Sequence, residues 1–258
     1  MKLLVLVCLA FQLSLVWETV CFSTKNSIPK APNLDKKAIS LVKGVKCSLQ
    51  NIPKGHQRNG IVRPGSKWTN FFIYIDPSYS TNDRALINNA AYWLGRMIPC
   101  VSFGVWRKGQ LPTAYNDTYI HIKKTGSGCW SYVGKWELRP QEMSLDPGCM
   151  TMETIMHEMI HALGFDHEQC RPDRDRYVKI NWENIEPERK EIFEKLTYAN
   201  GKTFDVPYNT KSIMHYSSYD FSSNGMPTIL TKNGNIIDNR DEVIQWTDIQ
   251  KLMMMYQC

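Results

Sequence analysis

The stretch from Thr151 to Glu168 reads TMETIMHEMIHALGFDHE and holds three of the six histidines of this 258-residue chain. His157 and His161 are four residues apart, so on a helix they project from one face. Gly164 stands where a left-handed turn would end that helix and reverse the chain. The turn would return His167 to the point that the other two imidazoles face. Three converging imidazoles predict a metal site.

Glu158 follows the first histidine directly, which completes the pattern H-E-x-x-H-x-x-G-x-x-H. Two histidines four apart are more often surface residues or satisfied core groups than ligands. Here five residue types share one register, which has roughly one chance in ten million per starting position. The pattern therefore predicts a catalytic site for one Zn²⁺ per chain, with three protein ligands and an open fourth position. The alternative is a zinc site that has lost activity.

The N-terminus has the pattern of a secretory signal, with Lys2 followed by an apolar run over 3–16. This run is too short to span a bilayer as a helix. We expect a signal peptide over 1–21, and a product that is secreted, extracellular and not anchored in a membrane.

Residues 22–58 are polar, rich in lysine and interrupted by proline, which is typical of a linker or pro-segment. Gln57-Arg58 is a candidate processing point, so the chain is predicted to be a latent precursor. The domain that carries the zinc motif would then cover 59–258, with lobes of about 59–164 and 165–258 on either side of an active-site cleft.

The distribution of charge argues against a nucleic-acid partner, although the net charge is +6. Residues 1–58 carry nine of the 31 Lys and Arg and two of the 25 Asp and Glu, which leaves 22 basic against 23 acidic residues beyond. The remainder is near neutral, so no basic stripe could follow a phosphate backbone.

The chain has eight cysteines, which together with a signal peptide indicate disulfides in an oxidising compartment. Cys8 and Cys21 would leave with the signal. The six others are Cys47, Cys100, Cys129, Cys149, Cys170 and Cys258, and their spacing alone does not decide the pairing. Asn116-Asp117-Thr118 is a sequon for N-glycosylation at Asn116 in a turn-like stretch.

Periodicity predicts both strands and helices, which indicates an α+β fold. Strands are expected at 71–75, 101–106, 119–122, 142–145 and 177–180. Helices are expected from Thr81 or Asn82 to Ile98, over 151–163, from Pro187 to Leu196, and over 246–256. The apolar side of the motif helix is interpreted as core packing.

In these motifs the chain resembles the astacin family of secreted zinc endopeptidases, within the metzincins. The residue after the third histidine is Glu168, as in astacins, whereas the related adamalysins have Asp there. Ser212-Ile213-Met214-His215-Tyr216 is similar to the Met-turn of the family. The segments CWSYVG, HEQCRPDRD and INWENI extend the likeness over about 59–258.

The resemblance implies a metzincin-like fold and a set of functional residues. The N-terminal lobe would have a twisted sheet and two long helices, and the C-terminal lobe would be mostly irregular with a C-terminal helix. The substrates would be proteins or peptides, and we expect a monomer. The implied residues are the zinc ligands His157, His161 and His167, the switchable ligand Tyr216, Met214 beneath the site, and the disulfides Cys100–Cys258 and Cys129–Cys149.

The implied mechanism uses Glu158 and Tyr216. Glu158 would take a proton from a zinc-bound water, whose pKa falls to about 7, and pass it to the leaving amine. Tyr216, once off the metal, would donate a hydrogen bond to the oxyanion. The other candidate function is a catalytically silent, secreted, zinc-containing binding protein, for which loss of Glu158 or of a histidine is expected.

Three further roles are implied by the resemblance. The run 142–145 would be an edge strand that pairs with extended substrate. Arg240 would line a substrate pocket that favours acidic residues, or be an ordinary surface residue. Cleavage after Arg58 would free an amino group at Asn59 that reaches Glu168; otherwise Glu168 orients His167 or is solvated.

The chain departs from the family in its pro-segment. Val45 stands where astacins usually place a zinc-binding aspartate, and Cys47 follows two residues later. The thiolate of Cys47 could ligate zinc and keep the enzyme latent. Cys170 has no counterpart in the family, so a Cys47–Cys170 disulfide is the other interpretation, and we favour it because all six cysteines then pair.

Overall fold

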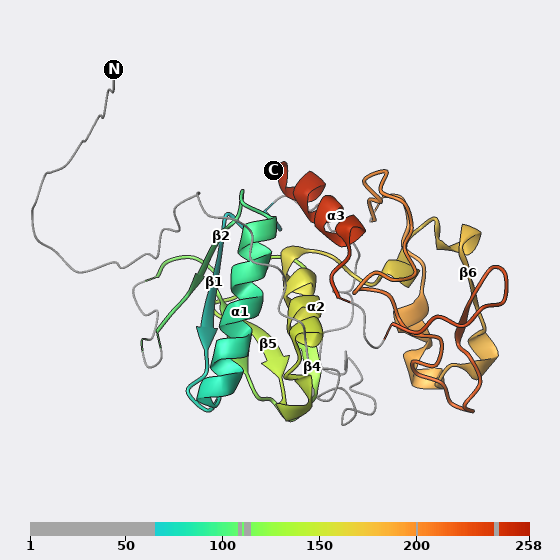
Figure 1. Cartoon of the computed structure of the whole chain (residues 1–258), viewed down its shortest axis with the longest axis horizontal. Helices are drawn as coiled ribbons and strands as arrows, with labels where there is room; N and C mark the ends of the chain where they lie inside the picture. The colour runs from blue at the N-terminus through green and yellow to red at the C-terminus, as the bar shows by residue number, and fades with distance from the viewer. Residues whose placement is uncertain (1–64, 108–109, 111–114, 200, 240–242) are drawn as a thin grey trace, which may run out of the picture. The chain divides into compact units, whose positions relative to one another are not determined.

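The computed structural model describes residues 65–258, apart from 108–109, 111–114, 200 and 240–242 (Figure 1). The predicted signal peptide and pro-segment, with Cys47 and Asn59, lie outside the described residues, as does Arg240. Within the described part, the chain combines a five-stranded sheet with three α-helices, which confirms the α+β prediction.

The sheet is mixed, with the spatial order β2-β1-β3-β5-β4. Its strands are β1 (Asn70–Ile75), β2 (Ser102–Val105), β3 (Ile120–Lys123), β4 (Cys129–Ser131) and β5 (Gln141–Leu145). The first four positions of this order are parallel neighbours, and β4 runs antiparallel to β5. Alternate residues of β1, Phe71, Ile73 and Ile75, are fully buried, as expected for a strand with one face in the core.

The prediction that 142–145 forms an edge strand is wrong. β5 lies between β3 and β4, and β4 is the strand at this edge. β4 has three residues, all buried, so it shows none of the alternation from which a strand can be predicted. Its neighbour was therefore assigned the position that β4 holds.

Two helices pack side by side over one face of the sheet, α1 (Thr81–Met97) and α2 (Met152–Leu163) (Figure 1). α1 begins at a capping box, in which the Asp83 backbone N–H donates to Ser80 Oγ at 3.1 Å and the Ser80 N–H donates to Asp83 Oδ2 at 3.3 Å. The cap is therefore Ser80, rather than Thr81 or Asn82.

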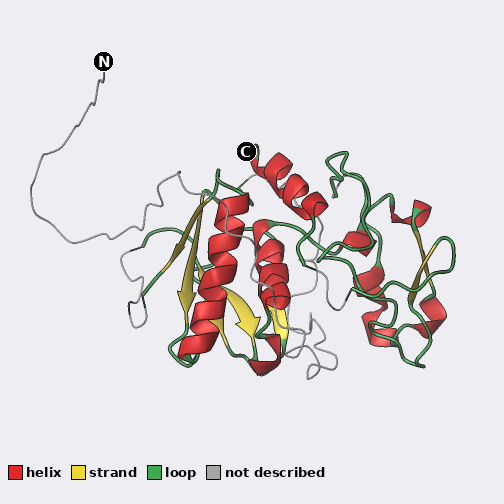
Figure 2. Cartoon of the chain, in the orientation of Figure 1, coloured by secondary structure: helices red, strands yellow, loops and turns green. Residues whose placement is uncertain are grey.

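The chain between α2 and α3 (Trp246–Tyr256) has little regular structure (Figure 2). It contains one antiparallel pair, β6 (Val178–Ile180) and β7 (Ile229–Thr231), and short 3-10 helices. The helix predicted from Pro187 to Leu196 is a 3-10 helix that ends at Phe193. A separate core holds this part together, formed by Val178, Ile185, Ile192, Phe193, Tyr208, Tyr216, Phe221, Ile229 and Ile237.

The C-terminal helix α3 completes the core of the N-terminal lobe, although it follows the C-terminal lobe in sequence. Leu252 and Met255 are buried in the same cluster as the sheet, α1 and α2. Tyr256 donates a hydrogen bond from its hydroxyl to the Leu163 carbonyl at 2.8 Å. A disulfide joins Cys258 to Cys100, just beyond α1.

A second disulfide, Cys129–Cys149, joins β4 to the 3-10 turn (Pro147–Cys149) that precedes α2. Both pairings are those that the resemblance to astacins implies. Among the described residues, no helix combines the length and apolar character needed to cross a membrane.

Gly164 ends α2 in the left-handed region, with φ of 115°. A Cβ at this position would lie 2.6 Å from Cε of Met255 in α3, so backbone conformation and packing both require glycine. The turn reverses the chain and starts the segment that leads to His167.

Replacing Gly164 with alanine should lower the free energy of unfolding by about 2 kcal/mol, because the residue is strained and its methyl group meets Met255. Urea denaturation with intact disulfides measures the change. Gly234→Ala is the matched control, since Gly234 has φ of 81° but nothing within 4 Å of the added carbon. Equal losses in the two variants would show that the contact with α3 contributes nothing.

Candidate metal centre

Two of the three clustered histidines come from α2. Thr151 caps this helix by accepting a hydrogen bond from the Thr154 backbone N–H at 3.1 Å. His157 and His161 follow one turn apart, with ring centroids separated by 4.6 Å. The helix thus presents two imidazoles to one point.

His167 reaches the same point after the turn at Gly164. Its Nε2 lies 3.2 Å from Nε2 of His161. One nitrogen from each of His157, His161 and His167 lies within 4.8 Å of the others, so the three side chains could hold one metal ion. The structure brings together the three histidines that the sequence motif predicts.

Backbone carbonyls orient two of these rings through Nδ1. His157 Nδ1 lies 2.7 Å from the carbonyl oxygen of Ile213, and His161 Nδ1 lies 2.6 Å from that of Phe165. A carbonyl only accepts hydrogen bonds, so Nδ1 must carry the proton in both rings. Each Nε2 is left with a lone pair directed at the shared point, as metal-binding imidazoles require.

The geometry fits a tetrahedral metal ion. Zinc–nitrogen bonds of 2.0–2.1 Å place neighbouring ligands about 3.3 Å apart, close to the 3.2 Å between Nε2 of His161 and Nε2 of His167. Among the described residues, none forms a hydrogen bond with the buried Nε2 of His157. A zinc ion would satisfy all three nitrogens at once.

Burial keeps these imidazoles neutral. Desolvation lowers the pKa of His161 and of His167 well below the ordinary value, and the neighbouring imidazoles lower it further. The neutral form is the one that binds a metal ion. Asp166 adds a carboxylate beside the group, with Oδ1 at 3.2 Å from Nδ1 of His167.

Glu158 lies within the same helix and is completely buried. Because it follows His157 directly, the helix carries a carboxylate next to the histidine group. The charged side chains of Glu are seldom buried to this extent without a specific role.

The Met-turn, residues 212–216, lies against the histidine segment. The backbone N–H of Glu168 donates to the carbonyl of Met214 at 2.8 Å, and the Met214 side chain is buried. The ring of Tyr216 lies 4.3 Å from the ring of His167, measured between centroids. Tyr216 is thus beside the third histidine, 49 residues after it in sequence.

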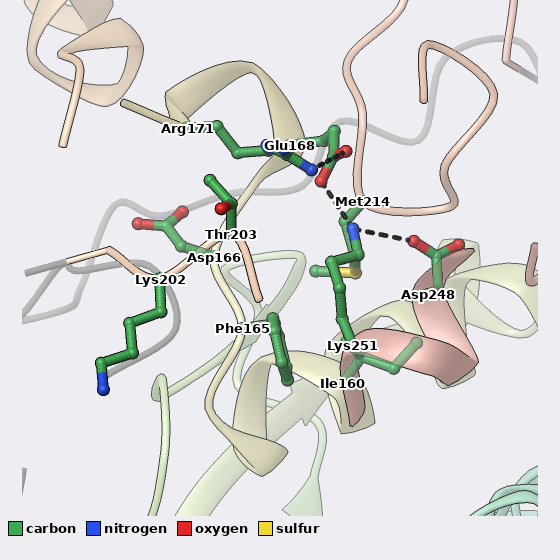
Figure 3. Close-up of a pocket in the computed structure, with 10 residues that line it drawn as sticks. All are labelled: Ile160, Phe165, Asp166, Glu168, Arg171, Lys202, Thr203, Met214, Asp248 and Lys251. Carbon is green, nitrogen blue, oxygen red and sulfur yellow. Dashed lines mark hydrogen bonds and ion pairs between the residues drawn. The ribbon is translucent and has the colours of Figure 1, made fainter. Parts of the chain in front are cut away.

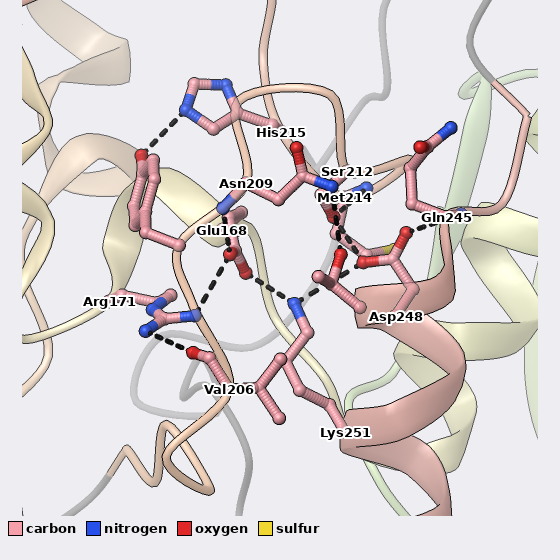
Figure 4. Close-up of polar contacts among 12 residues, drawn as sticks. Glu168, Arg171, Val206, Asn209, Ser212, Met214, His215, Gln245, Asp248 and Lys251 are labelled. Carbon is pink, nitrogen blue, oxygen red and sulfur yellow. Dashed lines mark hydrogen bonds and ion pairs between the residues drawn. The ribbon is translucent and has the colours of Figure 1, made fainter.

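Glu168 is neither solvated nor directed at His167, so both of those interpretations are wrong. Its carboxylate is buried and accepts hydrogen bonds from Arg171 Nη1 at 3.1 Å, Lys251 Nζ at 2.6 Å and the Asn209 backbone at 3.1 Å (Figure 4). The sequence analysis missed Lys251. A lysine on the largely apolar final helix was the available signal.

A small pocket opens beside this ion-pair cluster (Figure 3). Glu168, Lys251 and Asp248 line one side, and Phe165 and Ile160 line another. The other lining residues are Asp166, Arg171, Lys202, Thr203 and Met214. Charged groups of both signs therefore border the back of the metal centre.

Two other candidate residues lie apart from the histidines. Asn116 is exposed in the loop before β3, where a glycan could be attached. Cys170 is buried, donates to the Ile192 carbonyl at 3.3 Å and is bonded to no described cysteine. The predictions for Cys47 and Arg240 fall on residues that are not described.

The α+β fold and the three-histidine group together define a metzincin-type domain. The family model described as Astacin, which is a family of peptidases, matches residues 60–257. The chain belongs to the astacin family.

Three proteins illustrate the similarity. Zinc metalloproteinase nas-7 of Caenorhabditis elegans is 38% identical over 211 residues, which are 80% of this chain and 52% of nas-7. Meprin A subunit beta of Homo sapiens is 35% identical over 80% of this chain and 29% of meprin. High choriolytic enzyme 1, a hatching enzyme zinc-protease of Oryzias latipes, has a solved structure with a TM-score of 0.67 and 31% identity. The match covers 78% of this chain and all of that one. The chain spans about half the length of nas-7 and less than a third of meprin.

The His161→Ala variant should lose bound zinc, because two ligands on separate segments hold a metal ion far less tightly than three. Metal analysis after gel filtration of the unmodified and variant chains measures the difference. His121→Ala is the control, since His121 lies on β3 outside the histidine group. Zinc retained at the parent level by His161→Ala would contradict the assignment of the ligands.

Proposed function

We propose that this chain is a zinc-dependent endopeptidase that hydrolyses peptide bonds in proteins or peptides. The observation that carries the proposal is the convergence of His157, His161 and His167 beside the buried carboxylate of Glu158. The names of the relatives support it, since nas-7 is called a zinc metalloproteinase and the Oryzias protein a zinc-protease.

In the proposed mechanism, His157, His161 and His167 hold one Zn²⁺. When bound, zinc polarises a peptide carbonyl and makes water more acidic. Glu158 takes the proton of the attacking water and transfers it to the leaving amine. The hydroxyl of Tyr216 donates a hydrogen bond to the oxyanion that develops on the carbonyl. The ring of Tyr216 beside His167 is consistent with this position.

Substrate is proposed to bind along β4 rather than β5. β4 is the edge of the described sheet, and an edge strand offers backbone N–H and C=O groups to an extended peptide. Because the disulfide Cys129–Cys149 joins β4 to the start of α2, this edge is anchored close to the metal-binding helix. Arg240 remains a predicted pocket residue.

We also propose that the protein is a secreted precursor. The proposal divides the chain into a signal peptide (1–21), a pro-segment (22–58) and a catalytic domain (59–258), on the sequence features described above. The amino group freed at Asn59 would approach Glu168. That carboxylate is already paired with Arg171 and Lys251, so the amino group would add to an existing ion-pair cluster.

Within the pro-segment, we favour a Cys47–Cys170 disulfide over a Cys47 thiolate on zinc. Burial raises the pKa of the Cys170 thiol well above its ordinary value, so Cys170 itself is not a reactive thiolate. If the disulfide forms, processed protein should lose the mass of the pro-segment only after reduction. Intact-mass measurement before and after reduction tests this, and a pro-segment that separates without reduction would contradict the disulfide.

The Glu158→Gln variant should keep zinc and lose proteolysis by about 10²- to 10⁴-fold in kcat, because the amide has the same size but cannot accept the proton. Cleavage of a quenched fluorescent peptide library by processed protein measures the rate. Glu153→Gln, on the first turn of the same helix, is the control and should be fully active. A processed parent that binds zinc but cleaves nothing would favour the silent binding protein.

A further inference from the structure

Lys251 is a buried cation on α3 that lies between two buried carboxylates (Figure 4). Its Nζ is 2.6 Å from Oε2 of Glu168 and 3.4 Å from Oδ1 of Asp248. Lysine is seldom buried unless it is paired, and here it is paired on two sides. The two carboxylates belong to separate parts of the chain, one just after the third histidine and the other on the last helix.

The first carboxylate leads to the third histidine. Glu168 follows His167 directly, and its backbone N–H is bound to the Met214 carbonyl at 2.8 Å. Its side chain is held by Lys251, Arg171 and the Asn209 backbone. Fixing both ends of Glu168 restricts the backbone that carries His167.

The second carboxylate leads to the first histidine. Asp248 accepts hydrogen bonds from the Ser212 hydroxyl at 2.5 Å and from the Ile213 backbone N–H at 3.2 Å. The carbonyl of the same Ile213 faces Nδ1 of His157 at 2.7 Å. One residue therefore connects the carboxylate of Asp248 to the ring of His157.

Electrostatics require a cation at this point. Glu168 and Asp248 are both almost fully buried, and two carboxylates in such surroundings repel each other with little screening by water. Arg171 also pairs with Glu168, but its other contacts are Asp173 and the Val206 carbonyl. Among the described residues, Lys251 alone has ion pairs with both carboxylates.

We propose that Lys251 is a positioning residue of the metal centre, which holds Glu168 and Asp248 together and thereby fixes His167 and the ring of His157 from behind. The inference rests on the proposed zinc site and deepens it. It assigns to the C-terminal helix, which carries none of the metal ligands, a part in setting the affinity for the metal ion.

The test measures zinc affinity of the full chain by competition with a chromogenic chelator. Lys251→Met keeps the length of the side chain and removes its charge, and Lys251→Arg restores a cation. Leu252→Val, in the core on the same helix, is the control for a purely structural loss. The Co²⁺-loaded forms provide a second measurement, because their visible absorption reports the geometry of the ligands.

Lys251→Met should raise the Kd for zinc by about 10- to 100-fold, as loss of an outer partner of a metal ligand typically does. Its Co²⁺ bands should change, and Lys251→Arg should recover most of the affinity. Leu252→Val should lower the thermal midpoint and leave the Kd for zinc within about twofold of the parent.

A folded Lys251→Met variant with the zinc affinity and Co²⁺ spectrum of the parent overturns the inference alone. If Lys251→Met does not fold, Asp248→Asn takes its place, because it removes one charge of the same pair, and unchanged affinity there overturns the inference. A parent chain that binds no zinc overturns the proposed function together with this inference.

Discussion

Three imidazoles on two segments must reach one point, and the rest of the structure supports this requirement. The helix α2 can supply two of them, since residues four apart share a face. The third must come from chain that has reversed direction within a few residues. Gly164 makes the reversal possible, and α3 packs so closely over it that a side chain would collide with Met255. The turn and the last helix are therefore fixed together.

Buried polar contacts then orient what the turn brings together. The rings of His157 and His161 are directed by the carbonyls of Ile213 and Phe165, both outside the helix that carries the histidines. Each carbonyl lies in a segment with its own fixed contacts, so ring orientation depends on the packing of the whole domain. Loss of a remote contact would appear as a poorly aligned nitrogen rather than as a missing ligand.

The sequence predicted what local chemistry determines. The capped helix α2, its glycine end and the three histidines could be predicted from one short motif, and the apolar runs of β1, β3 and β5 from their residue types. Contacts between distant segments could not be predicted this way. β4 is too short to show a period, so the edge of the sheet was assigned to β5. The ion pair between Glu168 and Lys251 joins residues 83 positions apart, and no local pattern specifies it.

The disulfide between Cys100 and Cys258 makes the redox state of the surroundings part of the folding of this domain. It closes a span of 158 residues, so it removes much conformational freedom from the unfolded chain. In the folded protein it holds the C-terminal end of α3, the helix that carries Asp248 and Lys251. Under reducing conditions that end is no longer tethered, and the helix is retained by its core contacts alone. Oxidation at one end of the molecule thus helps to keep the histidines aligned at its centre.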